Sequence, residues 1–343
     1  MNALDFSKTA SRALAALGAL SFLALSPAPA ADANKSAKKY VAPRTEFGHP
    51  DLRGVWSFSS DTPLERPTEF KNREFLTREE IARRRQKADE REKWLAYEAG
   101  GTGGYNQYWL EGVPQEQDQR TSLIVDPPDG RLPPLQPGMK PAGGGLEADT
   151  PGQRPVRFLV GGIGKDGPED RGLSERCLKG FNSGPPFSPS AYNNNIQIFQ
   201  SKNTAVVMTE MIHEARVAPL DGRPRLDPAL TNWSGDSRGR WEGDTLVVET
   251  ANFSSKITSF QNVGNAAKLK ITERFTRTGP DQLEYRYTID DPATYTKTIT
   301  AVVPMVRTEG DLFEYACHEG NYGMTNILIG AREEERKAAV KKN

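Results

Sequence analysis

The chain has 343 residues, and its 45 lysine and arginine residues are balanced by 45 aspartate and glutamate residues, so the formal net charge at pH 7 is zero. Proteins that bind nucleic acid or anionic membranes concentrate positive charge on one surface, and this sequence has no basic run. Nucleic acid is therefore excluded as an expected partner, and a small-molecule substrate or ligand is expected instead.

The first 30 residues carry the three parts of a cleavable secretory signal peptide in their usual order. Lys8 and Arg12 precede an apolar run over residues 13–25, and the small residues Ala28-Pro29-Ala30 provide a cleavage site. The run is too short for a membrane span, which takes about 20 helical residues. We expect a periplasmic or secreted protein that has no integral membrane segment after cleavage.

Export would place the two cysteines, Cys177 and Cys317, in an oxidising compartment, where two thiols usually pair. One disulfide is therefore expected. It would close a loop of about 140 residues, for which the chain-entropy model gives a stabilisation on the order of 5 kcal/mol. The alternative, a catalytic thiolate, has no supporting motif.

Three elements are expected ahead of residue 100. Residues 31–48 are polar and are predicted to form a flexible lead-in, and residues 54–58 have the apolar and aromatic character of a first strand. Thr77 and Glu80 have the spacing of a capping box, in which each side chain bonds the other residue's backbone N–H at the start of a helix. The charged run that follows predicts a helix facing solvent.

Residues 100–155 are rich in glycine and proline and are predicted to form an irregular insertion. One short strand is expected within it, over residues 121–125, because turn residues end that run. Long segments of this kind are either coverings of a functional site or disordered, and composition does not choose between the two.

From about residue 192 onward, short alternating runs are separated by turn residues, which is typical of an antiparallel β-sheet. Strands are expected over residues 196–200, 205–217, 245–250, 269–277, 283–289, 296–303 and 312–317. Together with residues 54–58 they suffice to close a barrel or to form a two-sheet sandwich. A helix is expected over residues 322–337 and a charged tail over residues 332–343. The predicted fold is a single mainly β domain, over residues 49–331, with one or two flanking helices.

One phrase favours the barrel over the sandwich. Gly54-Val55-Trp56 resembles the G-x-W phrase that opens the first strand of lipocalin-like calycins. The resemblance implies an antiparallel meander barrel.

Glu273 interrupts the apolar face of its predicted strand. Alternation places Ile271 and Phe275 on one face, and Glu273 lies between them on the same face. Apolar surroundings tend to raise the pKa of a carboxyl group, which suits general acid or base catalysis. An ion pair with an arginine inside the barrel explains the residue equally well, and both interpretations stay open.

Two of the three histidines head the same dipeptide, in His213-Glu214 and His318-Glu319. Imidazole has a pKa near neutrality, and a neighbouring carboxylate can fix its tautomer. The two pairs are therefore candidates for an acid–base site, and a disulfide at Cys317 would hold the backbone beside His318. The alternative is a hydrogen-bonded histidine in or beside the sheet.

The sequence gives little support for a metal or an organic cofactor. It contains no H-x-H, H-E-x-x-H or clustered cysteine and histidine pattern, so a metal centre is not expected. The G-x-S-x-G elbow, the Walker phrase and the dinucleotide fingerprint are also missing, which excludes α/β-hydrolases, NTPases and Rossmann proteins.

Several polar phrases could orient a substrate. The run at residues 235–244 offers carboxylate and guanidinium groups together with a stacking ring. An ordinary hairpin loop with ion pairs is the alternative there, and a turn is the alternative for the asparagine run at residues 192–195. The candidate binding residues are Asn195, Arg216, Asp236, Arg238, Trp241 and Tyr315.

Four phrases resemble those of a large family of exported bacterial proteins without an assigned function. They are YNNN at residues 192–195, EMIHEAR at 210–216, GDSRGRWEGDTLVVET at 235–250 and YACHEGNY at 315–322. The resemblance covers about residues 51–331. It implies that the His-Glu pairs and the Trp241 run belong to one recurring unit, and it does not separate catalysis from binding.

The favoured function is an exported lyase or hydrolase that binds a small molecule in the mouth of the barrel. His213, Glu273 and His318 would transfer protons. Arg216, Arg238 and Tyr315 would orient the substrate or stabilise developing negative charge.

Two alternatives belong to other classes. The first is a non-catalytic, lipocalin-like ligand-binding protein in the same compartment, with Met208, Phe275, Tyr285 and Tyr287 lining its cavity. The second is an envelope interaction module that binds its partner through residues 100–155.

Overall fold

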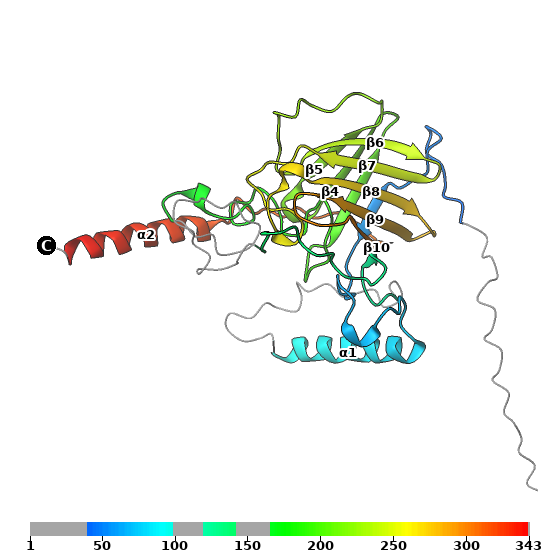
Figure 1. Ribbon diagram of the computed structural model, residues 1–343, viewed down its shortest axis with the longest axis horizontal. Helices are drawn as coiled ribbons and strands as arrows, with labels where there is room; N and C mark the ends of the chain where they lie inside the picture. Colours follow the sequence, from blue (N-terminus) through cyan, green and yellow to red (C-terminus); the bar gives the residue numbers. More distant parts are fainter. Residues whose placement is uncertain (1–39, 99–118, 142–164, 342–343) are drawn as a thin grey trace, which may run out of the picture. The chain divides into compact units, whose positions relative to one another are not determined.

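A computed structural model describes residues 40–98, 119–141 and 165–341 of the chain (Figure 1). The expected signal peptide, residues 31–39 of the expected lead-in and much of the expected insertion lie outside these ranges. Residues 40–48 belong to the same compact unit as the rest of the described chain, and Ala42 and Thr45 are buried in it.

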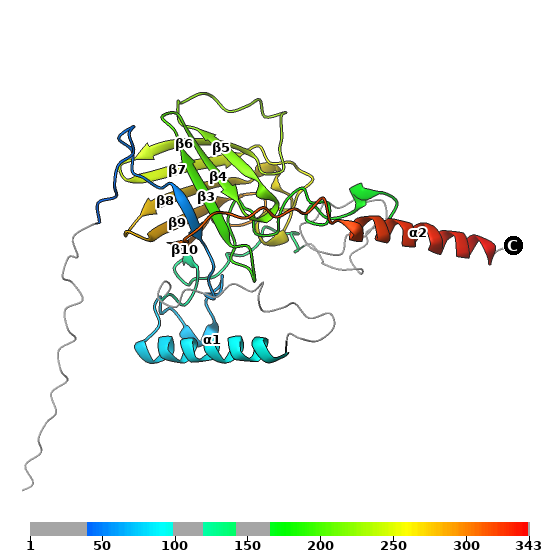
Figure 2. The ribbon, with the colours of Figure 1, turned by 180° about the vertical axis from the view of Figure 1, so that it is seen from behind.

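Within the described residues, nine antiparallel strands form a nearly closed barrel (Figures 1 and 2). Their order is β5-β4-β3-β1-β10-β9-β8-β7-β6, and the short strand β2 pairs with β10 beside this path. The bounds are β1 Gly54–Ser57, β2 Ile124–Asp126, β3 Asn195–Gln200, β4 Thr204–Thr209, β5 Ala215–Pro219, β6 Asp236–Glu242, β7 Thr245–Ala251, β8 Lys270–Arg277, β9 Gln282–Asp290 and β10 Ile299–Arg307. The predicted mainly β meander barrel is confirmed.

The two end strands of this path, β5 and β6, approach each other closely enough to complete the barrel. A Cβ atom added to Gly239 in β6 would lie 2.5 Å from Cδ2 of Leu220 and 3.5 Å from Cβ of Ala218. Just beyond β5, the guanidinium of Arg225 donates to the backbone oxygen of Asp236 at 2.6 Å. Contacts of this kind close the barrel between strands that form no continuous hydrogen-bonded ladder.

Aromatic side chains fill the barrel interior. Strands β8 and β9 turn every second residue inward, so Phe275, Tyr285 and Tyr287 are at most 1% exposed. Phe187, from a loop, packs among them, with its ring centroid 5.2 Å from that of Tyr285 and 5.4 Å from that of Phe58. Such ring pairs add about 0.5–1.5 kcal/mol each beyond the area they bury. The interior is a packed core.

The residues expected to line a carrier's cavity therefore have other roles. Phe275, Tyr285 and Tyr287 belong to the core. Met208 alternates along β4 with the inward-facing Val207 and Thr209, so it lies on the outer face of the barrel.

Two strand predictions and one loop prediction are wrong in detail. The run at residues 205–217 is split into β4 and β5 because Ile212 and His213 have φ values of 61° and 43°, which end the extended backbone. Residues 312–317 form no strand. Most of the run at 235–244, expected as a loop, is strand β6, in which Arg240 pairs with Glu249 of β7 and with Glu242 of β6 itself.

Two α-helices flank the described barrel, α1 (Arg78–Glu98) and α2 (Tyr322–Val340). The capping box is present at α1, where the backbone N–H of Thr77 donates to Glu80 at 2.7 Å and that of Glu80 donates to Thr77 at 3.3 Å. Short 3-10 helices are η1 Thr68–Phe70, η4 Pro168–Asp170, η5 Met211–His213, η6 Phe260–Asn262 and η7 Ala266–Lys268.

The predicted disulfide between Cys177 and Cys317 is formed. Beside it, the side chain of Asn321 donates to the backbone oxygen of Glu175 at 2.7 Å and accepts from the N–H of Met324 at 3.3 Å. Asn321 is the N-cap of α2, so the disulfide and this cap together attach the start of the helix to the segment around Cys177.

Candidate functional site

Four loop segments meet at one end of the barrel. They are residues 179–188, residues 210–214 between β4 and β5, residues 232–235 before β6 and residues 253–262 after β7. The first two are joined where Ser183 Oγ donates to the backbone oxygen of Met211 at 3.0 Å. The last two are joined by a hydrogen bond of 2.9 Å from the backbone of Ser254 to that of Asn232.

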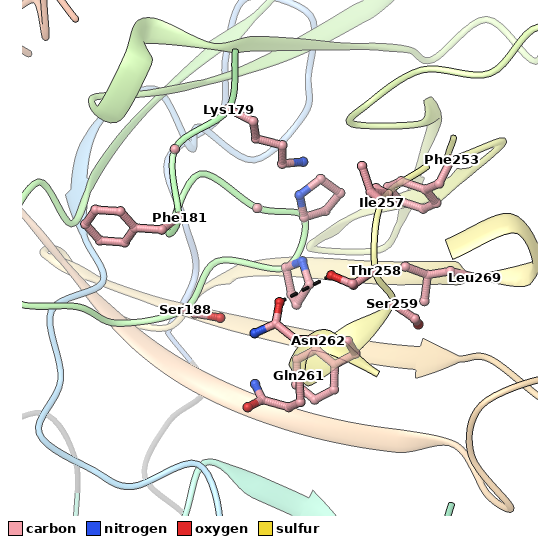
Figure 3. A pocket seen from close by; sticks show the side chains of 15 residues that line it. Lys179, Phe181, Ser188, Phe253, Ile257, Thr258, Ser259, Gln261, Asn262 and Leu269 are labelled. Carbon is pink, nitrogen blue, oxygen red and sulfur yellow. Dashed lines mark hydrogen bonds between the residues drawn. The ribbon is translucent and has the colours of Figure 1, made fainter. Parts of the chain in front are cut away.

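Residues 179–188 and 253–262 enclose a pocket of about 150 Å³ (Figure 3). Its walls are polar and apolar in nearly equal parts, and residues 258–262 supply polar groups on one side. In Figure 3 the amine of Lys179 points toward Ile257 and Phe253, across the pocket from the hydrogen bond between Thr258 and Asn262. The apolar side chains that line the pocket are Phe181, Pro185, Pro186, Phe253, Ile257, Phe260 and Leu269.

Lys179 is the only charged residue among the described residues that line this pocket, and it is 3% exposed. Its Nζ donates to Ser234 Oγ at 2.9 Å. Burial disfavours the ammonium form and lowers the pKa of Lys179 to about 8, although the carboxylates of Glu214 and Glu273 oppose this shift. A substantial fraction of the amine is therefore neutral near physiological pH.

Ser234 links Lys179 to Glu214. Its hydroxyl donates to Oε1 of Glu214 in a short hydrogen bond, so that amine, hydroxyl and carboxylate form one chain. The second oxygen of Glu214, Oε2, is buried and has no hydrogen-bond partner among the described residues. The carboxylate can therefore accept a further hydrogen bond without breaking its bond to Ser234.

Left-handed backbone conformations border this site. Ile212 and His213 have positive φ just before Glu214, and Gln261 and Asn262 have φ of 55° and 58° at the pocket wall. Non-glycine residues in this region cost of order 1–3 kcal/mol each, and such residues cluster at functional sites. Here they aim Glu214 toward Ser234 and turn residues 261–262 along the pocket.

Glu273 lies deeper in the barrel and is fully buried. Arg216 donates to both of its carboxylate oxygens, at 2.6 and 2.8 Å, and the hydroxyl of Tyr285 donates to one of them at 2.8 Å. Burial and the neighbouring carboxylate raise the pKa of Tyr285 well above its usual range. Of the two interpretations of Glu273, the structure shows the ion pair with an arginine inside the barrel.

The three residues predicted to transfer protons are not brought together within the described chain. Glu273 is enclosed by Arg216 and Tyr285, whereas the side chains of His213 and His318 are exposed. General acid–base catalysis needs its groups within hydrogen-bonding reach of one substrate. The positions of these three residues therefore do not support a shared role.

Most of the predicted binding residues stabilise the fold. Arg238 donates to Asp236 and to the backbone oxygen of Pro224, which fastens the chain after β5 to β6. Trp241 stacks on His49, with ring centroids 5.0 Å apart, so His49 covers one face of the indole ring. Asn195 donates to Glu210 at 2.9 Å.

The other two predicted binding residues differ in their surroundings. Tyr315 is half-buried two residues before the disulfide, and its backbone oxygen accepts from Cys317. Arg216 belongs to the ion pair with Glu273, but its Nε is buried and has no hydrogen-bond partner among the described residues.

Lys179 and Ser234 were not predicted from the sequence. The ordinary pKa of a lysine lies far from neutrality, and only burial brings it into the catalytic range. Lys179 lies in an irregular segment where periodicity does not report burial. One feature of the sequence could have drawn attention to Lys179. It lies two residues after Cys177, at the start of a glycine- and proline-rich loop.

The comparisons with known proteins assign no family. No protein-family model matches the chain, and no curated protein matches it either. The nearly closed antiparallel barrel is compatible with a calycin-like fold.

The described ranges hold neither a cluster of metal-ligating side chains nor a membrane-spanning helix. They contain no group of three or more histidine, cysteine, aspartate or glutamate residues placed to hold a metal ion. No helix in these ranges is both long and apolar enough to span a bilayer.

Proposed function

We propose that the protein is an exported enzyme of the lyase or hydrolase class that transfers protons to and from a small molecule bound in the loop pocket. Lys179 is the general acid–base group. Ser234 and Glu214 hold its amine in place and exchange protons with it. The observation that carries this proposal is the chain of hydrogen bonds from Lys179, a residue that lines the pocket, through Ser234 to Glu214.

The chain suits proton transfer near neutral pH. Catalysis by a general acid or base is most effective when the pKa of the group lies near the working pH, and the pKa of Lys179 is about 8. The Ser234 hydroxyl accepts a hydrogen bond from Lys179 and donates one to Glu214. It can therefore pass a proton between the amine and the carboxylate.

The pocket suits a small substrate that has both an apolar part and a polar group. Its volume of about 150 Å³ is comparable to that of a protein cavity that holds one benzene molecule. Its apolar side chains can bind the apolar part, and the polar groups of residues 258–262 can fix the orientation.

Binding without catalysis is the competing function, and one feature disfavours it. A ligand carrier needs only shape and a few polar anchors. Burying an ionisable amine costs free energy, and an apolar ligand does not require it. A lysine enclosed at the pocket is therefore better explained by chemistry than by carriage.

The test is consumption of a metabolite that depends on Lys179. The mature protein would be incubated with a small-molecule extract of the cell envelope, and the compounds would be followed by mass spectrometry. The Lys179→Met variant removes the amine and keeps the aliphatic chain, and Lys297→Met at an exposed lysine is the matched control. We expect a compound that the wild type and Lys297→Met consume and Lys179→Met does not. Equal consumption by all three, or none, would refute the proposal.

Export is tested separately. Expression of the full chain in a Gram-negative host, followed by cell fractionation and sequencing of the amino terminus, should recover the protein in the periplasm or medium, beginning after Ala30. Recovery of the uncleaved chain in the cytoplasm would contradict this part of the proposal.

A further inference from the structure

We propose that Lys179 acts as a nucleophile and forms an imine with the carbonyl carbon of a small, uncharged aldehyde or ketone bound in the loop pocket. This inference rests on the proposed function, because it assigns the substrate class and the first covalent step at the same site.

The position of the amine carries the argument. Lys179 lines the pocket, is 3% exposed, and its amine points toward Ile257 and Phe253 (Figure 3). Ser234, the other nucleophile of the chain, is 8% exposed and is not among the described residues that line the pocket. Of these two nucleophilic residues, Lys179 is therefore the one that belongs to the described pocket wall.

The surroundings also keep the amine reactive. A lysine becomes nucleophilic when it loses its proton, and a desolvated site favours the neutral form. Burial lowers the pKa of Lys179 to about 8, which makes the neutral amine available at pH 7–8. The hydrogen bond to Ser234 fixes the nitrogen, so that part of its freedom is lost before the substrate binds.

The bonds and protons of the step balance. The lone pair of Nζ attacks the carbonyl carbon and forms a carbon–nitrogen bond, while the carbonyl π electrons move to oxygen. The resulting carbinolamine loses its hydroxyl group as water once that oxygen is protonated. Ser234 and Glu214 accept protons from nitrogen and return them to the departing oxygen, so no oxidant or reductant is needed. Water later reverses the reaction and releases the amine.

The lining of the pocket indicates which carbonyl compounds fit. Lys179 is the only charged residue among the described lining residues, and imine formation uses it. A substrate carboxylate would then lie in the pocket without a cation to pair with, which is unfavourable. We therefore infer an uncharged carbonyl compound no larger than about a benzene ring and one or two further atoms.

Reductive trapping tests the step without knowledge of the natural substrate. The mature protein with its disulfide intact would be treated with benzaldehyde and sodium cyanoborohydride at pH 7, and the modified lysines located by peptide mass spectrometry. Hydride reduces the imine to a stable amine. We expect modification of Lys179 at least about tenfold faster than of the exposed Lys297, because far more of the amine is neutral at this pH. Pyruvate, used in place of benzaldehyde, should modify Lys179 more slowly.

Two serine variants test the role of the relay, one at Ser234 and one as a control. Ser234→Ala retains the amine and removes the proton relay, and it should slow the trapping of Lys179 several-fold. Ser201→Ala, at an exposed serine in the turn between β3 and β4, should leave it unchanged. Equal modification of Lys179 and the exposed lysines in the wild type would overturn the inference, and this readout does not depend on any variant folding.

The outcomes also separate this inference from the proposed function. If a metabolite is consumed only when Lys179 is present and yet no adduct is trapped, the imine is wrong and the acid–base enzyme stands. If Lys179 is trapped and no metabolite is consumed, the carbonyl site stands and the enzyme proposal fails.

Discussion

Arg216 of β5 and Glu273 of β8 form a two-point ion pair inside the barrel, with donor–acceptor distances of 2.6 and 2.8 Å. The two strands are not neighbours in the hydrogen-bonded sheet, because β5 lies at one end of the strand order and β8 lies near the other. The pair therefore adds a side-chain connection across the place where the barrel closes.

Removing one partner of this pair should be costly. Arg216→Met leaves the Glu273 carboxylate buried without its cation, and the free energy of unfolding should fall by about 3–5 kcal/mol. The double variant Arg216→Met/Glu273→Leu removes both charges and should lose clearly less. Urea denaturation of the two single variants, the double variant and the wild type measures this difference. Additive losses would show that the two side chains do not stabilise each other.

Lys179 should make stability rise with pH above about 8. Its pKa in the folded protein is about 8, below the usual 10.5, so between these values the unfolded chain binds more protons than the folded one. The penalty for burying the charge is fully present below pH 8 and is relieved as the pH rises. Between pH 7 and pH 10 the wild type should gain about 2–3 kcal/mol relative to Lys179→Met, measured by urea denaturation. A constant difference between the two proteins would contradict the lowered pKa.

Gly235 should tolerate no side chain. Its φ is +72°, and a Cβ atom would lie 2.6 Å from Cγ2 of Thr250 and 2.7 Å from the backbone oxygen of Ala251. Gly243 is the matched control, because its φ is +61° and nothing lies within 4 Å of its added Cβ. Gly243→Ala should cost about 1 kcal/mol for its backbone conformation alone, and Gly235→Ala about 2 kcal/mol more. Thermal unfolding of both variants compares these costs, and equal melting temperatures would exclude the close approach at Gly235.

Loss of the disulfide should destabilise the domain. Cys177 and Cys317 are 140 residues apart, and removal of a native disulfide typically costs about 2–5 kcal/mol. The Cys177→Ser/Cys317→Ser variant should therefore melt at a lower temperature than the oxidised wild type, and reductant should lower the melting temperature of the wild type only. If reductant left the wild type unaffected, the bond would add nothing to stability.

The fold could be predicted from the sequence to the extent that strands alternate. Runs such as residues 269–277 and 283–289 turn apolar residues inward at every second position, and they appear as β8 and β9. β6 lacks this pattern, because Asp236 and Arg238 form hydrogen bonds to the chain after β5. Its side chains therefore do not alternate between the core and solvent. The alternating run at residues 205–217 contains a chain reversal at Ile212 and His213. The sequence pattern does not show this reversal, which depends on the positive φ values of these two residues.

The candidate site was harder to predict, because its chemistry depends on enclosure. Glu273 was recognisable as a carboxylate on an apolar face, and its ion pair with Arg216 was among the interpretations considered. His213 and His318 attracted notice through their intrinsic pKa, yet their side chains are exposed. Lys179 draws its altered pKa from loops that are close together only in the folded chain.

The position of β1 affects how the barrel can assemble. Strands β3 to β5 and β6 to β10 are two successive meanders, and β1 lies between β3 and β10 and bonds both. Trp56 pairs with Ile196 on one side and with Arg307 on the other, so the second ladder joins positions about 250 residues apart. Contacts of such sequence separation form slowly, so we expect the pairing of β1 with β10 to form late in folding, after the local hairpins of the two meanders.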